Sequence, residues 1–489
     1  MSLETAIVLA LLVPFTGAIG IALTGRWPNV RETVTLVTAA VLAVVVWSML
    51  PALLDGARPS VTAFEMLPGV SIGFEVEPLG MLFAALASLL WIVNSVYSIG
   101  YMRGNAEKHQ TRFYVCFAIA LSATMGIAFA GNLLTLFLFY EILTLSTYPL
   151  VAHKGDAATV ASARVYLGLL LATSIGLFLP AIVWTYLAAG TLDFELGGIL
   201  AGKLSGPAVG LLLGLFAFGV GKAALMPVHR WLPAAMVAPT PVSALLHAVA
   251  VVKAGVFTIT KLIVYVFGVD ALFAEASAGW LLYAAAFTII AASLVALRQK
   301  NLKRLLAYST VGQLSYVIMA AAILKPLSEV GAAIHIVAHA FGKITLFFAA
   351  GSIYTASKKT EIPDLRGIAR RMPWTMAAFT IGALSMIGVP PTGGFVSKWY
   401  ILAGAFQSDN YLAIFTIIAS TGLTAAYMLP IVFSAWFESE DPTRTKDHGE
   451  APWPVVAALV TTAALTILFF LFNQTALDLE SQLVREASP

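Results

Sequence analysis

Five lysines and one glutamate lie inside apolar stretches of this sequence that otherwise have the composition of membrane helices. With the three histidines that accompany them, the set is Glu141, Lys222, Lys253, Lys261, Lys343, Lys398, His247, His335 and His339. An ionisable side chain in hydrocarbon costs at least ~2.5–3.5 kcal/mol on insertion scales, so such residues are retained there mainly for function. A file of protonatable groups through a helical bundle indicates a proton path.

The lysines and the glutamate suit this chemistry because burial disfavours the charged form of each group. A buried lysine therefore exchanges its proton more readily than one in water. Glu141 is the one carboxylate that we expect in the membrane interior, and its expected partner is Lys222. Such a contact either acts as a switch, because breaking it changes the proton affinity of both groups, or is a static ion pair between helices.

The sequence HIVAHAFGK places His335, His339 and Lys343 four residues apart, which predicts one helix face. Histidine titrates nearest physiological pH, so we expect a proton relay between lysines, with a polar packing contact as the alternative. The HxxxH spacing also resembles a zinc pair. That helix offers neither a third ligand nor a glutamate base, so we expect no metal site.

The stretch SALLHAVAVVKAGVF carries His247 and Lys253 six residues apart, which predicts that they point to different faces of one helix. Lys261 lies nearer the end of the same stretch. A long side chain near a helix end can snorkel to the interface, so we expect Lys261 to stay outside the path.

Composition defines the broad class. The chain of 489 residues is 60% hydrophobic and only 11% charged, whereas soluble domains carry about 25% charged residues. It is therefore expected to be an integral membrane protein in the lipid bilayer, and the net charge of +3 gives no reason to expect nucleic-acid binding. The single cysteine, Cys116, excludes an intramolecular disulfide and a cysteine-ligated cluster, and we expect no cofactor.

Apolar runs separated by Gly, Pro and charge predict an all-α protein of about fourteen transmembrane helices in a single membrane domain, 1–489. The N-terminus is interpreted as the first span. Alternate loops hold nineteen of the 28 Lys and Arg residues, the other loops and the C-terminus hold four, and five are intramembrane. This bias predicts that the basic loops are cytoplasmic and that both termini lie outside, on the periplasmic side of a bacterial inner membrane. The 438–450 loop is expected to be a solvated connector.

Two spans are interrupted by helix-breaking residues beside a lysine. In the seventh, 207–229, Lys222 precedes Pro227; in the twelfth, 375–408, Lys398 follows Pro390, Pro391, Gly393 and Gly394. Proline removes a backbone donor and clashes with the preceding turn, so broken helices are expected there. Paired broken helices are typical of ion pathways in transporters built from inverted repeats. We expect helices 1–3 over 1–111, two inverted five-helix repeats over 112–268 and 278–438, and a last helix over 451–473.

These residues resemble the antiporter-like subunits shared by Mrp-type cation/proton antiporters and respiratory complex I. The most specific segments are NLLTLFLFYEILTLSTYPLV, GKAALMPVHRWLPAAMVAPTPVSALLHAVAVVKAG, HIVAHAFGKITLFFAAG and GVPPTGGFVSKW. The resemblance implies fourteen helices, broken helices seven and twelve, and a hydrated axis of charged residues. It assigns the family's functional positions to Glu141, Lys222, Lys253, His335, His339 and Lys398.

Within this family, the length and the VSALLHAVAVVKAG segment look most like the Mrp D subunit. The resemblance then implies a proton-translocating subunit, not itself an enzyme, of a multi-subunit Na⁺/H⁺ antiporter with other membrane subunits as partners. The alternative is a proton-pumping subunit of a redox-driven NADH:quinone oxidoreductase or a related complex. A membrane enzyme is disfavoured because it would need a metal or an acidic diad.

Overall fold

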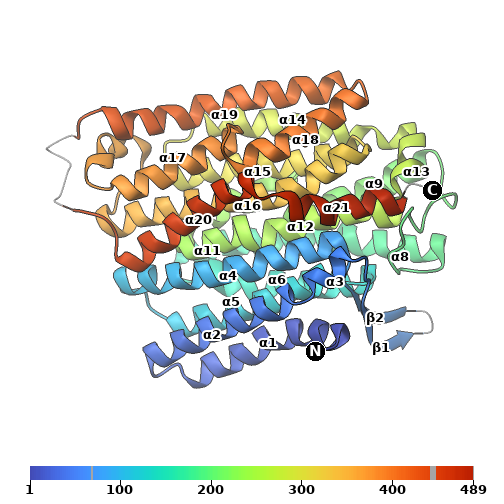
Figure 1. Ribbon diagram of the computed structural model, residues 1–489, viewed down its shortest axis with the longest axis horizontal. Coiled ribbons are helices and arrows are strands. Elements are labelled where there is room, and N and C mark those ends of the chain that lie inside the picture. The colour runs from blue at the N-terminus through green and yellow to red at the C-terminus, as the bar shows by residue number, and fades with distance from the viewer. Residues whose placement is uncertain (68–69, 441–447, 488–489) are drawn as a thin grey trace.

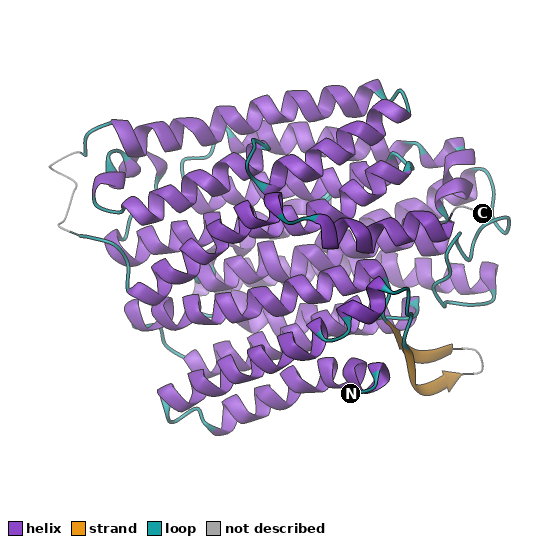
Figure 2. Ribbon diagram, viewed as in Figure 1, coloured by secondary structure: helices purple, strands orange, loops and turns teal. Residues whose placement is uncertain are grey.

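The computed structural model describes residues 1–67, 70–440 and 448–487. Nearly all of this chain is helical, and the long helices run side by side along one axis (Figures 1 and 2). Among the described residues, twelve helices are long and apolar enough to cross a membrane. Two shorter apolar helices, Pro207–Gly219 and Pro373–Ile387, belong to the spans predicted to be broken. The prediction of an all-α membrane protein with about fourteen spans is therefore confirmed.

The N-terminal segment forms one side of the bundle. Its elements are α1 (Leu3–Leu23), α2 (Pro28–Trp47), α3 (Leu50–Leu54), β1 (Ser60–Leu67), β2 (Val70–Glu75) and α4 (Pro78–Gly104). The two strands pair antiparallel, with Ser60 opposite Glu75, and the hairpin projects from one end of the bundle (Figure 2). We call this the outer end. The loops between α1 and α2 and after α4 lie at the opposite end, as the alternation of basic residues predicts (Figure 1).

The next elements correspond to predicted spans four to eight. They are α5 (Gln110–Ala128), α6 (Leu133–Val151), α7 (Ala157–Thr173), η1 (Ser174–Phe178), α8 (Leu179–Ala189), α9 (Pro207–Gly219), η2 (Gly221–Ala223), η3 (Val228–Arg230), α10 (Trp231–Ala234), η4 (Ala235–Val237), α11 (Thr240–Ala244), η5 (Leu245–Val249), α12 (Val251–Lys261) and η6 (Leu262–Phe267). The elements from α11 to η6 form one span that is buried along its whole length.

The second half of the chain corresponds to predicted spans nine to thirteen. Its elements are α13 (Val269–Ala274), η7 (Ala276–Ala278), α14 (Trp280–Ala296), α15 (Leu302–Ala322), α16 (Pro326–Ser357), η8 (Ile362–Leu365), η9 (Ile368–Arg370), α17 (Pro373–Ile387), α18 (Gly393–Gln407) and α19 (Tyr411–Phe437). The long helix α16 is buried from Val330 to Ile353 and packs against α15, α17 and α18. The two central spans of the bundle are therefore those that carry most of the singled-out lysines and histidines.

Both predicted helix breaks are present, and they contain Pro227, Pro390 and Pro391 as predicted, but their bounds differ from the prediction. The first break begins at Val220, where α9 ends, well before Pro227. The second lies between Gly388, which has φ +90°, and Thr392, so Gly393 and Gly394 begin α18 instead of interrupting it. Gly394 is needed for packing, since a Cβ there would lie 1.8 Å from the carbonyl oxygen of Ser385.

The C-terminal segment contains a helix that the sequence analysis missed. After α20 (Trp453–Leu471), the chain continues as α21 (Gln474–Ala487), which packs against α4 and α16 and extends toward the outer end (Figure 1). Its amphipathic pattern is too polar to resemble a membrane span. Part of the predicted 438–450 connector, residues 441–447, lies outside the described residues.

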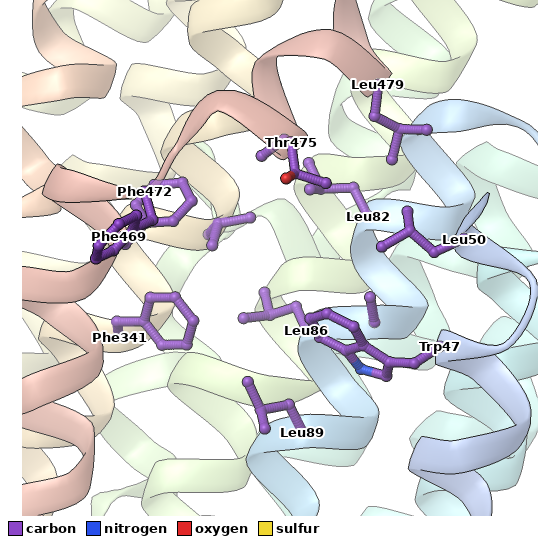
Figure 3. A pocket seen from close by; sticks show the side chains of 13 residues that line it. Trp47, Leu50, Leu82, Leu86, Leu89, Phe341, Phe469, Phe472, Thr475 and Leu479 are labelled. Atoms are coloured by element: carbon purple, nitrogen blue, oxygen red, sulfur yellow. The ribbon is translucent and has the colours of Figure 1, made fainter. Parts of the chain in front are cut away.

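An apolar cavity of about 330 Å³ lies beneath α21, between the N-terminal helices and α16 (Figure 3). Leu82 and Leu86 line it from α4, Phe341 from α16, and Phe469 and Phe472 from the C-terminal segment. None of the singled-out lysines or histidines lines this cavity. The candidate functional residues therefore lie in the packed interior of the bundle and not at this cavity.

Candidate functional site: a buried file of lysines and histidines

Lys222 is fully buried in η2, at the point where α9 has ended. Its ammonium Nζ donates to the carbonyl oxygen of Tyr140 at 2.7 Å and to Thr144 Oγ1 at 2.6 Å. The same Nζ lies 3.1 Å from the centre of the Tyr140 ring, whose negative face attracts a cation. The break in the seventh span thus places a lysine directly against α6.

Glu141 also lies on α6, but its carboxylate does not contact Lys222. Neither carboxylate oxygen has a hydrogen-bond partner in the described part of the chain, and Glu141 interacts with Lys222 only through space. The predicted direct pair is therefore wrong. Consecutive residues of a helix point about 100° apart, and Lys222 is held by the face that carries Tyr140 and Thr144. Glu141 lies instead beside side chains exposed at the surface of the bundle, which are Leu138, Ile142 and Leu145.

Lys253 and His339 form a buried contact between the two central spans of the bundle. Nζ of Lys253, on α12, lies 2.5 Å from Nδ1 of His339, on α16, and both side chains are buried. An ammonium can only donate, so Nδ1 accepts and the ring proton then resides on Nε2. This contact brings a lysine of predicted span eight against a histidine of predicted span eleven.

Close packing of α12 on the first break supports this arrangement. A Cβ on Gly255 would lie 2.3 Å from the backbone nitrogen of Ala223 and 2.3 Å from the carbonyl carbon of Lys222. Only glycine allows the backbone of α12 to approach that closely. The main chain beside Lys253 therefore touches the main chain at Lys222. The two lysine side chains have different hydrogen-bond partners, Tyr140 for Lys222 and His339 for Lys253.

His335 connects α16 to both α15 and α18. Its Nδ1 lies 2.8 Å from Ser397 Oγ, and its Nε2 lies 3.1 Å from Gln313 Oε1. The His335 ring stacks on that of His339, with 6.1 Å between the ring centres. Ser397 immediately precedes Lys398, so His335 occupies the position between the Lys253–His339 contact and the lysine of the second break.

Lys398 binds the backbone that the second break leaves free. Its Nζ donates to the carbonyl oxygens of Met386 at 3.0 Å and Ile387 at 2.9 Å, at the end of α17. Thr421 Oγ1 on α19 accepts a third hydrogen bond at 3.3 Å. Backbone freed at membrane depth must be satisfied by protein or water, and here the lysine supplies the donors.

Lys343 and His247 each contact a side chain of α15. Lys343 Nζ donates to Ser309 Oγ at 2.9 Å, and His247 Nδ1 lies 3.1 Å from Thr310 Oγ1. The expectation that His335, His339 and Lys343 lie on one helix face is only partly met, because the three side chains contact different neighbours. Successive four-residue steps rotate by about 40°, which is enough to direct these side chains to different neighbours.

Lys261 does not snorkel, which corrects the sequence-based expectation. Its side chain is 1% exposed, and Nζ lies 3.1 Å from Oε1 of Glu77 and 2.9 Å from the carbonyl oxygen of Ala130. Glu77 precedes the first residue of α4 and is also buried, so Glu141 is not the only interior carboxylate. The sequence analysis missed Glu77 because it lies at the edge of an apolar run, where a carboxylate is usually solvated.

Most ring nitrogens of His335 and His339 have protein partners, whereas His339 Nε2 has none among the described residues. Three of the four ring nitrogens of this HxxxH pair lie within hydrogen-bond distance of a side chain: both of His335 and Nδ1 of His339. These three nitrogens are therefore occupied by protein partners. Within the described residues, no cluster of three His, Cys, Asp or Glu side chains could hold one. These contacts favour proton exchange over metal binding at this helix.

The fold and the site define a class: a polytopic helical membrane protein with two broken helices and a buried file of basic side chains that crosses from one half to the other. Residues 130–424 match the family described as NADH:quinone oxidoreductase/Mrp antiporter, TM. The chain belongs to this family. The predicted resemblance to the antiporter-like subunits is therefore confirmed.

Known proteins agree with this assignment. NADH-quinone oxidoreductase subunit N of Desulforudis audaxviator is 33% identical over 384 residues, which cover 76% of this chain and 74% of that protein. A chain of the Mrp complex from Dietzia sp. DQ12-45-1b matches with a TM-score of 0.87 and 21% identity over 100% of this chain and 98% of that one. A chain of the archaeal membrane-bound sulfane sulfur reductase matches with a TM-score of 0.85 and 23% identity, covering 98% and 97%. The two structures share the fold with this chain, and all three proteins are parts of multi-subunit complexes.

Proposed function

We propose that this chain is the proton-translocating subunit of a multi-subunit cation/proton antiporter of the Mrp type. The observation that carries the proposal is a succession of side chains that are at least nine-tenths buried: Lys253 contacts His339, His339 stacks on His335, and His335 contacts the residue before Lys398. Each of these groups can bind and release a proton, and their succession links two broken-helix regions. Lys222 extends the file into the first break, and His247 and Lys343 form a branch on α15.

The file suits protons better than sodium. Na⁺ requires several oxygen ligands, and a cation placed among lysines is repelled by them at short range. We therefore assign proton movement to this chain and sodium movement to another subunit or another surface. Glu141 remains part of the proposed path as the carboxylate that acts on Lys222 from a distance.

The membrane orientation is part of the same proposal. The basic loops gather at the end opposite the β1–β2 hairpin, which supports a cytoplasmic location for that end in a bacterial inner membrane. The order of helices from α5 to η6 recurs from α14 to α19, which supports two inverted five-helix repeats. The apolar surface of α6 around Glu141 supports packing against another membrane subunit.

A redox-driven pump is the second candidate, because a curated relative is a subunit of NADH-quinone oxidoreductase. Both functions would use the same file, and they differ in what drives it. In the first, a cation gradient drives proton movement; in the second, electron transfer in a partner chain does.

The complete native complex in everted membrane vesicles tests both proposals. We expect added Na⁺ to collapse a preformed pH gradient with the wild-type chain and not with Lys398→Ala. Lys203→Ala is the matched control, because Lys203 is exposed and donates only to the carbonyl of Ala189. Normal collapse with Lys398→Ala would contradict the path. A pH gradient that responds to an electron donor but to no added cation would favour the redox-driven pump.

A further inference from the structure

A second group of buried titratable side chains lies at the outer end, apart from the file between Lys253 and Lys398. Its centre is the ion pair in which Lys261 Nζ lies 3.1 Å from Glu77 Oε1. The hydroxyl of Tyr265 donates to the other carboxylate oxygen, Oε2, at 2.9 Å. All three side chains are at most about one-twentieth exposed, so the group is closed off from bulk water.

Two backbone N–H groups also donate to the Glu77 carboxylate. The backbone N–H of Leu79 donates to Oε2 at 2.9 Å and that of Gly80 to Oε1 at 3.0 Å. These are the unpaired donors at the start of α4, where the positive end of the helix dipole also favours a negative charge. The Glu77 carboxylate and the Lys261 ammonium therefore balance each other's charge.

Glu480 is a fourth titratable group, and no hydrogen-bond donor or counter-ion contacts its carboxyl among the described residues. It lies on α21 with Leu477 and Leu479 and is 1% exposed, and neither carboxyl oxygen has a hydrogen-bond partner in the described part of the chain. Burial and the nearby Glu77 carboxylate raise the pKa of the Glu480 carboxyl well above its ordinary value. A buried carboxyl without a partner is costly, so its retention on the packed face of a helix calls for a reason.

The charged and titratable groups around Glu480 come from several elements. Glu77 faces it from the start of α4, and Tyr265 interacts with it from η6. Arg58, in the loop before β1, donates to Gln482 on α21 at 3.0 Å. The half-buried Glu75 of β2 interacts with Lys261, Glu77, Arg58 and Asp193. Acidic groups thus lead from Glu480 toward the surface of the outer end.

We propose that Glu480 and the Glu77–Lys261–Tyr265 cluster form a proton-holding site at the outer end, which exchanges one proton with the water on that side. The loaded site holds Glu480 as a carboxylic acid beside the Glu77 carboxylate and the Lys261 ammonium. Unloading breaks the Glu480 O–H bond, delivers the proton to water and leaves a carboxylate. The inference rests on the proposed function, because it makes this site the outer terminus of the path.

The position of Lys261 supports this assignment. It lies on the same helix as Lys253, eight residues further toward the outer end, which corresponds to about 12 Å. A static ion pair would explain Glu77 and Lys261 alone. It would not explain Glu480, whose carboxyl has no hydrogen-bond partner among the described residues and which lies on α21, packed against α4.

The transport assay on the complete complex in everted vesicles tests the site with Glu480→Gln. Gln has nearly the same shape but cannot carry the exchangeable proton, so we expect at least a tenfold slower ion-driven collapse of the pH gradient, and partial transport with Glu480→Asp. Asp478→Asn is the matched control on the exposed face of the same helix, where Asp478 accepts from Gln474 at 2.7 Å. A wild-type rate with Glu480→Gln would overturn the proposal.

Two further measurements separate this site from the central file and from a structural role. Slow transport with Lys398→Ala and normal transport with Glu480→Gln would overturn the outer site alone. The reverse result would keep the outer site and contradict the central file.

In the purified complex, we expect an infrared carboxylic-acid band that disappears in Glu480→Gln and persists in Asp478→Asn. Identical wild-type and Glu480→Gln spectra across the titration would also overturn the proposal.

Discussion

Lys253 and His339 touch across the middle of the bundle, with 2.5 Å between Nζ and Nδ1. The two residues come from the two central spans of the chain and are separated by 86 positions in the sequence. Because the contact joins the two central spans, the proposed function makes it the point at which a proton would pass from one span to the other. The remaining members of the file are arranged around it, with Lys222 on one side and His335 and Lys398 on the other.

Replacing Gly255 should disturb the first break. A Cβ there would lie 2.3 Å from backbone atoms of Lys222 and Ala223, so Gly255→Ala must push α12 away from η2 and weaken the hydrogen bonds of Lys222. We expect a lower thermal unfolding temperature of the purified complex and slower transport. Gly168→Ala is the control, since nothing lies within 4 Å of a Cβ at that helical position. Equal unfolding temperatures for the two variants would contradict the close packing.

Removing Lys261 alone should be severe. Lys261→Ala leaves the buried Glu77 carboxylate without its counter-ion, and breaking a buried pair typically costs about 3–5 kcal/mol. We therefore expect poor assembly of this variant, measured as subunit recovery in the solubilised complex.

The double variant Glu77→Gln/Lys261→Met removes both charges and should recover assembly, because a neutral replacement of a buried ion pair is often tolerated. Its transport should nevertheless remain slow, because the outer site has lost two of its charged groups. Full assembly of Lys261→Ala would contradict the buried pair, and wild-type transport by the double variant would contradict the outer site.

Glu480 should make stability fall as pH rises. The pKa of its carboxyl is well above 4.5 in the folded protein, so between about pH 4.5 and that raised value the unfolded chain loses a proton that the folded chain keeps. The free energy of unfolding then decreases with pH, by about 1.4 kcal/mol per unit for one group. Glu480→Gln should remove this loss, so that it is more stable than the wild type at neutral pH and equal to it below about pH 4.5. Thermal unfolding over a pH series checks this, and a stability gain that does not vary with pH would contradict it.

Much of the fold could be predicted from the sequence because membrane helices need long apolar runs, and helix breaks need proline and glycine. The same reasoning identified Lys222, Lys253, His339 and Lys398, since an ionisable residue in an apolar run is conspicuous wherever it points. The actual partners could not be predicted. His339 meets Lys253 and not Lys343 because partner choice depends on how α12 and α16 are rotated.

The outer cluster escaped prediction for physical reasons of its own. Glu77 lies at the end of a helix, where a carboxylate is normally solvated, and only the fold shows that it is buried against Lys261 and Tyr265. Glu480 belongs to an amphipathic helix whose pattern does not reveal which face packs against the bundle. In both cases burial depends on contacts between distant segments.

A double-variant cycle at Lys253 and His339 tests the central claim most directly. Ion-driven proton flux would be measured in vesicles with the assembled complex carrying Lys253→Met, His339→Gln or both. If protons pass through this contact, each single variant slows flux strongly and the double variant is no slower than the slower single one, because one break already interrupts a serial path. Wild-type flux in either single variant, or two losses that multiply in the double variant, would contradict a path through Lys253 and His339.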